Sequence, residues 1–355
     1  MADKKRCLMI GAGGMANGWI RKFYPRFNHR HEIVALVDID TEVLHNTGDF
    51  LGLARNQRYT NMETAFGEVE ADYCTIVIPP ARHKDAVMLA VDNKMDILSE
   101  KPIADTWSAC VEIYRAVTNA GLKMQVIQNY RYSSQMLTMR QVLRERGLGR
   151  INFVQARFSA DYREYGAWAA WRHEIPHTLL VEGAVHHFDM LRNLTGGDCK
   201  MIAGWEWNRP WGSFQGDCCA MYVLDMTNGT KAAYEGSCLG AATQNNWHQE
   251  YYRAECETGA VAVGNDGITR TYRYTPGTGM CIDEVSTIIP EYDGHQWLIN
   301  EFLDWLDGGP APDTRLEQNI RSVAMVFGAI QASRNHSTVD VEKMIDPVVI
   351  NSSGD

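Results

Sequence analysis

A glycine-rich turn near the start of the chain constrains the fold more than any other feature. The segment Gly11-Ala12-Gly13-Gly14-Met15-Ala16 joins a short apolar run, Cys7 to Ile10, to a helical pattern from Gly14 to Phe23. Glycine allows the tight turn and the close approach of a pyrophosphate, and a small sixth residue lets helix and strand pack closely. The first N–H groups of the helix would then face the phosphates. The loop residues expected at a dinucleotide are Gly11, Gly13, Gly14, Met15 and Ala16.

The next strand ends in an acidic residue at the spacing typical of a ribose-binding carboxylate. Glu32 to Val37 reads as a strand, and Asp38 follows it, roughly 20 residues past the glycine loop. A carboxylate there accepts hydrogen bonds from the ribose hydroxyls of NAD and repels the 2′-phosphate of NADP. The nearest downstream arginine or lysine is Arg55. NAD is therefore the expected cofactor, in preference to NADP.

The predicted secondary-structure pattern changes about one third of the way along the chain. Up to residue 128, apolar strands alternate with helical patterns, which predicts parallel βαβ units and a Rossmann domain. Beyond residue 150 strands dominate, and Asn228-Gly229 and Asp266-Gly267 are hairpin turn signals. We expect an α/β fold with a Rossmann domain at 1–128 and an α+β domain at 129–355, built on a large open, mostly antiparallel sheet. Whether the C-terminal helices pack back on the first domain stays open.

Composition excludes two classes of partner. The formal net charge of -10 argues against a nucleic-acid partner, because phosphate binding needs a basic face. No apolar run reaches the roughly 18 residues that a membrane-spanning helix needs. A cytoplasmic enzyme with a small-molecule substrate is the expectation.

Four further motifs resemble one enzyme family. They are Ile78-Pro79-Pro80-Ala81-Arg82-His83, Ser99-Glu100-Lys101-Pro102-Ile103-Ala104, Asn129-Tyr130-Arg131 and the segment from Glu182 to Asp189. Their order is similar to that of the Gfo/Idh/MocA oxidoreductases, named for glucose–fructose oxidoreductase, inositol dehydrogenase and a rhizopine-catabolism protein. The resemblance implies a C-terminal sheet with a substrate pocket on one face and often an oligomer interface on the other, hence a homodimer or homotetramer. It also implies further cofactor contacts from Ile78, Pro79, Pro80, His83, Glu100, Lys101 and Asn129. For Glu100, a role in holding the turn before Lys101 stays open as the alternative.

Two residues suit the oxidation of an alcohol. Histidine titrates near neutral pH and can take the hydroxyl proton, and a cation beside the same oxygen stabilises developing alkoxide character. We expect His186 to act as acid/base and Lys101 to polarise the oxygen. His187 is an alternative base, although the H-x-x-D spacing to Asp189 favours His186.

Glu182 is the third expected catalytic residue. It stands where the family usually has an aspartate, four residues before His186, so one helix would place both on one face. Whether glutamate fully replaces the aspartate stays open.

The second half of the chain also carries residues suited to a carbohydrate. Eight of the ten tryptophans follow residue 160, and aromatic faces pack well on the C–H faces of sugars. The residues expected at the substrate are Lys101, Arg131, Trp168, Trp171, Arg172, His173, Glu182 and His186. His173 and His177 have the helical spacing of metal ligands, but Pro176 lies between them and disfavours a continuous helix. No metal site is expected.

Together these features favour an NAD-dependent dehydrogenase that oxidises a secondary alcohol of a sugar, an inositol-like polyol or a glycoside. Two alternatives stay open. One is an enzyme that retains NAD and cleaves a glycoside through transient oxidation, and the other is a non-catalytic, NAD-responsive regulatory protein.

Overall fold

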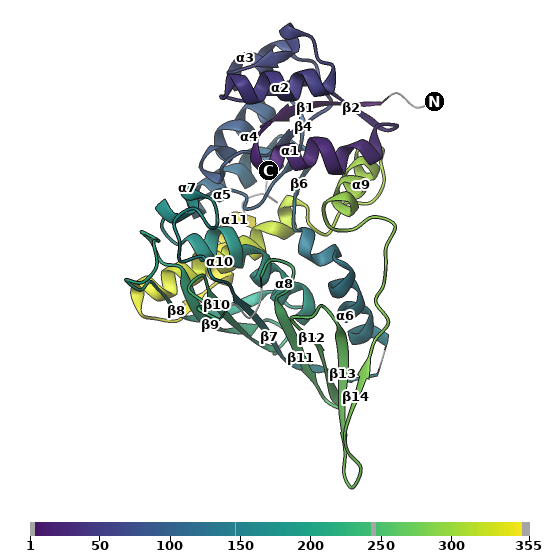
Figure 1. Cartoon of the computed structure of the whole chain (residues 1–355), viewed down its shortest axis with the longest axis vertical. Coiled ribbons are helices and arrows are strands. Elements are labelled where there is room, and N and C mark those ends of the chain that lie inside the picture. Colours follow the sequence, from purple (N-terminus) through teal and green to yellow (C-terminus); the bar gives the residue numbers. More distant parts are fainter. Residues whose placement is uncertain (1–3, 146, 243–245, 350–355) are drawn as a thin grey trace. The chain divides into compact units, whose positions relative to one another are not determined.

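The chain forms two compact units (Figure 1). The computed structural model describes residues 4–145, 147–242 and 246–349. The first unit combines the described residues through Gln128 with His295–Ile320 and the described end of the chain from Val348. The second unit combines Asn129–Gly294 with Arg321–Pro347. Segments far apart in the sequence therefore share a unit.

The first unit is built on a six-stranded sheet in the order β3-β2-β1-β4-β5-β6. All five strand pairs are parallel. The strands are β1 (Lys5–Ile10), β2 (His31–Val37), β3 (Arg58–Tyr59), β4 (Tyr73–Ile76), β5 (Asp96–Ser99) and β6 (Met124–Val126). The order reverses between β1 and β4, and ligands of open α/β sheets bind at such a switch point. Because Gly11 follows β1 directly, the glycine loop lies at this position.

Three helices of the first unit begin at side-chain caps that the sequence supplies locally. The Asp40 carboxylate accepts hydrogen bonds from the first turn of α2, and Asn61 and Thr106 do the same for α3 and α5. Such caps satisfy N–H groups that lack partners within the helix. The helices of this unit are α1 (Gly14–Gly18), η1 (Trp19–Phe23), η2 (Tyr24–Phe27), α2 (Thr41–Leu51), η3 (Arg55–Gln57), α3 (Met62–Glu68), η4 (Pro80–Arg82), α4 (His83–Asp92), α5 (Trp107–Asn119) and α9 (Gly294–Leu306).

The second unit is built on a nine-stranded sheet in the order β14-β13-β12-β11-β7-β10-β9-β8-β15. Only the β7–β10 pair of these strands is parallel. The strands are β7 (Ile151–Ser159), β8 (Cys199–Trp207), β9 (Cys219–Met226), β10 (Lys231–Ser237), β11 (Tyr251–Cys256), β12 (Gly259–Val263), β13 (Thr269–Thr275), β14 (Gly279–Glu284) and β15 (Val339–Asp340). The predicted parallel Rossmann sheet followed by a mostly antiparallel sheet is therefore confirmed.

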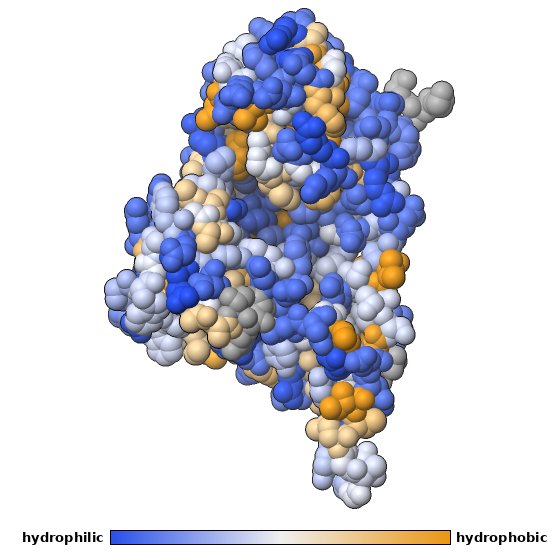
Figure 2. All heavy atoms as spheres, viewed as in Figure 1, coloured by the Kyte–Doolittle hydropathy of each residue, from blue (hydrophilic) through white to orange (hydrophobic). Residues whose placement is uncertain are grey.

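Both predicted hairpin turns are present in this sheet. Asn228-Gly229 joins β9 to β10, and Asp266-Gly267 joins β12 to β13. Gly229 has φ +87° and Gly267 has φ +75°, the left-handed conformation that glycine adopts without strain. The β13–β14 hairpin extends beyond the neighbouring strands (Figure 1), and Figure 2 shows apolar side chains gathered on it. Tyr274, Met280 and Ile282 are the exposed apolar residues there.

Helices cover one face of the second sheet. The ring of Phe188 on α8 meets Tyr222 and Tyr234 edge-on, and the Tyr222 hydroxyl donates to the Ala329 carbonyl on α10. The helices of this unit are η5 (Asn129–Tyr132), α6 (Ser134–Glu145), α7 (Ala170–Glu174), η6 (Leu179–Ala184), α8 (Val185–Thr195), most of α10 (Leu316–Asn335) and nearly all of α11 (Glu342–Val349). No helix in the described ranges is long and apolar enough to cross a bilayer.

Candidate active site

The glycine loop is pressed against the first sheet on one side and open on the other. Gly11 has φ +105°, and a Cβ atom there would lie 2.2 Å from the Val77 carbonyl oxygen. Its N–H donates to the Val37 carbonyl at 2.8 Å. A Cβ at Gly14 would meet no atom within 4 Å. The loop therefore requires glycine at its first position and leaves space for a ligand beside Gly14.

Asp38 is tied to the same loop through the main chain. One carboxylate oxygen accepts from the N–H groups of Ala12 and Gly13 at 2.8 and 3.2 Å, and the other accepts from the N–H of Asp40 at 2.9 Å. A carboxylate has about four acceptor positions, so lone pairs remain for ribose hydroxyls. Asp38 thus joins the ends of β1 and β2 at the position expected for a ribose.

These residues fit a bound NAD. The loop offers backbone close to a pyrophosphate, Asp38 offers acceptors for a ribose, and no arginine or lysine lies between Asp38 and Arg55 to pair with a 2′-phosphate. Next to Asp38, Ile39 is 90% exposed, so an apolar side chain is available beside the expected ribose position. An adenine ring would cover such a side chain.

Glu100 is held inside the first unit, directly before Lys101. Its Oε1 accepts from the Trp19 indole N–H at 2.8 Å and lies 3.1 Å from the His295 Nε2, and its Oε2 accepts from the Lys101 N–H at 3.3 Å. Burial raises the pKa of Glu100, but the hydrogen bond from His295 and the nearby Lys101 charge outweigh it, so the pKa lies below its ordinary value. Glu100 therefore fixes the main chain that carries Lys101.

His83 joins two of the motif segments. It is fully buried, and its ring nitrogens lie 2.9 Å from the carbonyl oxygens of Pro102 and Ile78. Both nitrogens thus face the protein's own main chain. In this arrangement His83 shapes the loops after β4 and β5, and a direct contact with the cofactor stays a prediction.

In the second unit, a π-helix precedes the helix that carries the histidine pair. Glu182 lies in the π-helix η6, whereas His186 lies in α8, which begins at Val185. The four-residue spacing predicts both on one face of an α-helix. A π-helix has a wider turn, so this rotational relation does not carry over, and such segments are frequent at functional sites.

Glu182 pairs with an arginine that lies over two tryptophans. Its Oε2 accepts from the Nε and Nη2 atoms of Arg172 at 3.1 and 3.0 Å. The Arg172 guanidinium carbon lies 5.1 Å from the Trp168 ring centroid and 4.4 Å from that of Trp171. Four of the residues expected at the substrate are thereby brought together.

The two adjacent histidines occupy different environments. The His186 ring stacks on Tyr130, with centroids 4.4 Å apart and planes 11° apart. His187 is fully buried, with Nδ1 3.0 Å from the Tyr234 hydroxyl and Nε2 3.6 Å from Glu250 Oε1. His187 is therefore held between core partners, whereas His186 retains 7% exposure.

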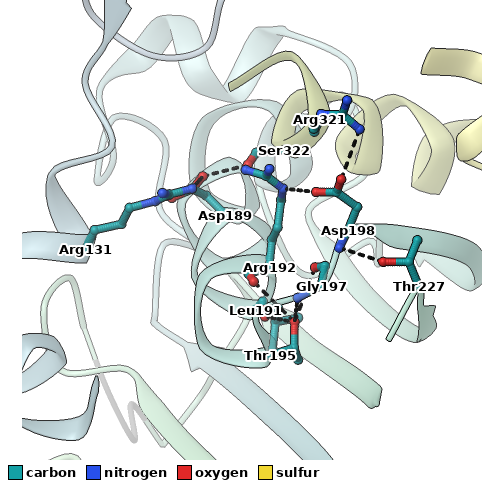
Figure 3. A network of polar contacts seen from close by, with 10 residues as sticks. All are labelled: Arg131, Asp189, Leu191, Arg192, Thr195, Gly197, Asp198, Thr227, Arg321 and Ser322. Atoms are coloured by element: carbon teal, nitrogen blue, oxygen red, sulfur yellow. Dashed lines mark hydrogen bonds and ion pairs between the residues drawn. The ribbon is translucent and has the colours of Figure 1, made fainter. Parts of the chain in front are cut away.

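Arg131 holds α8 in place through a buried ion pair (Figure 3). Its Nε and Nη2 donate to both carboxylate oxygens of Asp189 at 2.6 and 2.7 Å, and Ser322 Oγ donates to the same carboxylate at 2.6 Å. The Arg131 and Asp189 side chains are 5% and 1% exposed. This guanidinium positions the helix that carries His186, and a direct contact of Arg131 with substrate stays a prediction.

His173 packs under a neighbouring loop. It is fully buried, its ring stacks on Phe214 at 4.1 Å, and its Nδ1 lies 2.8 Å from Ser213 Oγ. Helix α7 ends at Glu174, so His173 and His177 do not share a helix. This agrees with the effect expected of Pro176.

Sequence reasoning missed Trp247 and the stacking role of Tyr130. The Trp247 ring lies 5.2 Å from Trp168 and 4.7 Å from Phe158. A Cβ at Gly183 would lie 3.1 Å from Trp247 Cη2, so glycine beside Glu182 lets this aromatic cluster pack. The only sequence signal was the aromatic content of the second half, which does not single out Trp247.

Comparison with known proteins decides the family. Residues 5–128 match the model described as an oxidoreductase family with an NAD-binding Rossmann fold, and residues 136–262 match that of the GFO/IDH/MocA C-terminal domain. The chain belongs to the Gfo/Idh/MocA oxidoreductase family. It is accordingly an NAD-dependent oxidoreductase, and the predictions of NAD and of the family are confirmed.

Three similar proteins illustrate the range of this Gfo/Idh/MocA member's relatives. An uncharacterized protein of Sinorhizobium fredii is 38% identical and covers 98% of this chain and 99% of its own. A D-apiose dehydrogenase of Rhizobium rhizogenes is 21% identical over 88% of this chain and 91% of its own. A crystal structure of an Agrobacterium radiobacter oxidoreductase in complex with NAD⁺, L-tartaric acid and magnesium is 20% identical, with a TM-score of 0.82 over 96% of this chain and 100% of its own.

Proposed function

We propose that this protein is a dehydrogenase that oxidises a secondary alcohol of a sugar, an inositol-like polyol or a glycoside. The observation that carries the proposal is the cluster in the second unit, where the Glu182–Arg172 pair lies against Trp168 and Trp171. Aromatic faces with charged groups beside them suit a ligand that presents both C–H faces and hydroxyls. The family supports the redox chemistry, and the D-apiose dehydrogenase among the relatives supports the substrate class.

Each proposed catalytic residue has a defined task. Bound NAD⁺ supplies the hydride acceptor. Lys101 lies directly after β5, where a parallel sheet binds ligands, and its ammonium would polarise the substrate oxygen. His186 would take the hydroxyl proton. His187 is the weaker candidate because it is fully buried between Tyr234 and Glu250.

Glu182 has a proposed role through Arg172. A glutamate is one methylene longer than the family's usual aspartate, and here the carboxylate pairs with the Arg172 guanidinium. We expect the Glu182 carboxylate to accept hydrogen bonds from substrate hydroxyls and the Arg172 guanidinium to donate hydrogen bonds to them. Glu182→Asp should therefore raise KM more than it lowers kcat.

The test is a screen for NAD⁺ reduction over sugars, inositols and glycosides, with NADP⁺ in parallel. With the best substrate, Lys101→Ala and His186→Ala should each lower kcat by about 10²-fold or more, the size of a general acid–base contribution. Matched controls are Lys94→Ala and His29→Ala, because both side chains are exposed. Full activity in both active-site variants would remove the proposed mechanism.

The same screen separates the alternatives. A glycoside-cleaving enzyme that retains its cofactor would release sugar without accumulating NADH. A regulatory protein would bind NAD⁺ and turn over none of the substrates. Accumulation of NADH in proportion to the oxidised product supports the dehydrogenase.

A homo-oligomer is proposed through the open face of the second sheet. Trp205 pairs with Met221 across β8 and β9, and both are exposed together with Val223 on the same face. Exposed apolar clusters of this kind mark interfaces. Light scattering should give a dimer or tetramer, and Trp205→Asp with Met221→Asp should shift it towards the monomer.

A further inference from the structure

Three side chains outside the proposed dehydrogenase site converge in the second unit. His177 lies between α7 and η6, Glu206 lies on β8, and Asp217 lies in the segment before β9. One nitrogen of His177 and one carboxylate oxygen from each acid lie within 4.8 Å of one another. Imidazole and carboxylate are both common ligands of transition metals. None of the three has a task in the proposed reaction.

A close backbone crossing brings the ligands together. A Cβ at Gly216 would lie 2.6 Å from the Ile175 carbonyl oxygen and 2.7 Å from the Pro176 Cα. Only glycine allows this approach, which places Asp217 beside His177. Glu206, the third residue of the cluster, is fixed through its main chain, because its N–H donates to Ser333 Oγ on α10 at 3.0 Å. The cluster is therefore built by tertiary packing of three separate segments.

The Glu206 carboxylate is buried with one of its two oxygens left without a partner. Its side chain is 3% exposed, and Oε2 has no hydrogen-bond partner among the described residues. Oε1 lies 2.5 Å from His177 Nδ1, and Oε2 has no such neighbour. Burying a carboxylate with one oxygen left without a donor is costly unless a cation compensates it. This carboxylate, aimed at His177 and Asp217, is the independent sign of a ligand.

We infer that His177, Glu206 and Asp217 bind one divalent transition-metal ion, with Zn²⁺ preferred. A set of one nitrogen and two oxygens suits Zn²⁺, whose ligand distances are about 2.0–2.2 Å, and the three ligand atoms already lie within 4.8 Å of one another. Two carboxylates and a neutral imidazole leave two negative charges, which a divalent cation balances. The ion would tie the segment after α7 to β8 and to the start of β9.

Arg334 competes with the ion for this site. Its Nη2 lies 2.5 Å from His177 Nε2, so the guanidinium donates to the imidazole and adds a positive charge. When Nδ1 binds a metal, Nε2 carries the proton, and two donors would then face each other. Arg334 is exposed near the end of α10, so its side chain can rotate into solvent. Removing this charge should therefore strengthen metal binding.

The experiment is a Zn²⁺ titration of the full chain after treatment with EDTA, followed by calorimetry. The expected result is saturable binding of one equivalent, with a visible absorption band when Co²⁺ replaces Zn²⁺. Glu206→Gln and Asp217→Asn should each weaken binding at least tenfold, while Arg334→Gln should tighten it. The matched control is Glu235→Gln, a carboxylate on β10 paired with Arg157, which should leave binding unchanged.

Several outcomes would overturn the inference. Wild-type protein that binds no equivalent of Zn²⁺ is decisive by itself and needs no variant. Binding that survives both Glu206→Gln and Asp217→Asn places the ion elsewhere. If Arg334→Gln weakens Zn²⁺ binding, the arginine stabilises the cluster and does not compete with the ion. Circular dichroism of each variant confirms that the fold is retained.

Discussion

The two units hold their functional groups by different means. In the first unit, Asp38 is anchored by main-chain N–H groups of the glycine loop, and Glu100 by the N–H of the next residue together with Trp19 and His295. In the second unit, the Asp189 and Glu182 carboxylates are held by side chains from other elements. The main-chain contacts of Asp38 survive changes in the side chains of the loop, whereas the carboxylates of the second unit depend on each partner side chain. Side-chain substitutions should therefore cost more in the second unit.

The largest expected effect is on the buried ion pair of the second unit. Arg131→Met leaves the Asp189 carboxylate buried without its main partner, which should lower the free energy of unfolding by about 3–5 kcal/mol. Urea unfolding followed by circular dichroism measures it. The control is Arg150→Met, because Arg150 and Glu257 are 90% and 45% exposed and an ion pair this exposed to solvent adds little to stability. Equal losses of unfolding free energy in Arg131→Met and Arg150→Met would contradict the expected difference between the buried and the exposed ion pair.

The first unit should show its own sensitivity to acid. Burial lowers the pKa of His31 from 6.5 to about 4. Between these values the unfolded chain binds a proton that the folded chain does not, so the free energy of unfolding falls as pH falls. The loss reaches about 3 kcal/mol, at 1.36 kcal/mol per pKa unit. His31→Gln should flatten the pH dependence between 6.5 and 4, and exposed His29→Gln should leave it unchanged.

A substitution at the cofactor loop should change affinity while the fold is kept. Asp38→Asn removes the charge that accepts from the loop N–H groups and from a ribose. Hydrogen bonds to charged groups contribute about 1.5–3 kcal/mol, so the Kd for NAD⁺ should rise roughly 10- to 100-fold. The Kd for NADP⁺ divided by the Kd for NAD⁺ should also fall, because the charge that repels a 2′-phosphate is gone. Asp92→Asn on the exposed end of α4 is the control, and equal Kd values in both variants would contradict the assignment.

The smallest expected effect tests a local cap. Asn61 Oδ1 accepts from the Thr64 N–H at 2.8 Å at the start of α3. Asn61→Ala should lower the free energy of unfolding by about 1 kcal/mol, and exposed Thr60→Ala should change it by less than half as much. Thermal or urea unfolding resolves the difference. If Asn61→Ala lowered the free energy of unfolding as much as Arg131→Met does, a local helix cap would matter as much as a buried ion pair.

Sequence reasoning was most accurate where the physics is local. The glycine loop, Asp38 and the two hairpin turns follow from neighbouring residues and their allowed backbone angles. The region from α2 to α3, residues 41–68, was not assigned, although Asp40 and Asn61 are caps that could have revealed both helices. Strands β12, β13 and β14 were also missed, apart from the turn between the first two. These strands are held by hydrogen bonds to neighbouring strands of the sheet, and their sequences alone do not specify that pairing.

The sequence alone determined the cofactor class and the Rossmann domain, because a tight turn and an acidic strand end are set by residues close to one another along the chain. The tertiary structure decided the hydrogen-bond partners of Arg131, His187 and Glu182, which lie 58, 47 and 10 residues away along the chain. It also decided that the segment before α8 is a π-helix. Partners of this kind are chosen by packing in three dimensions, which no local pattern encodes.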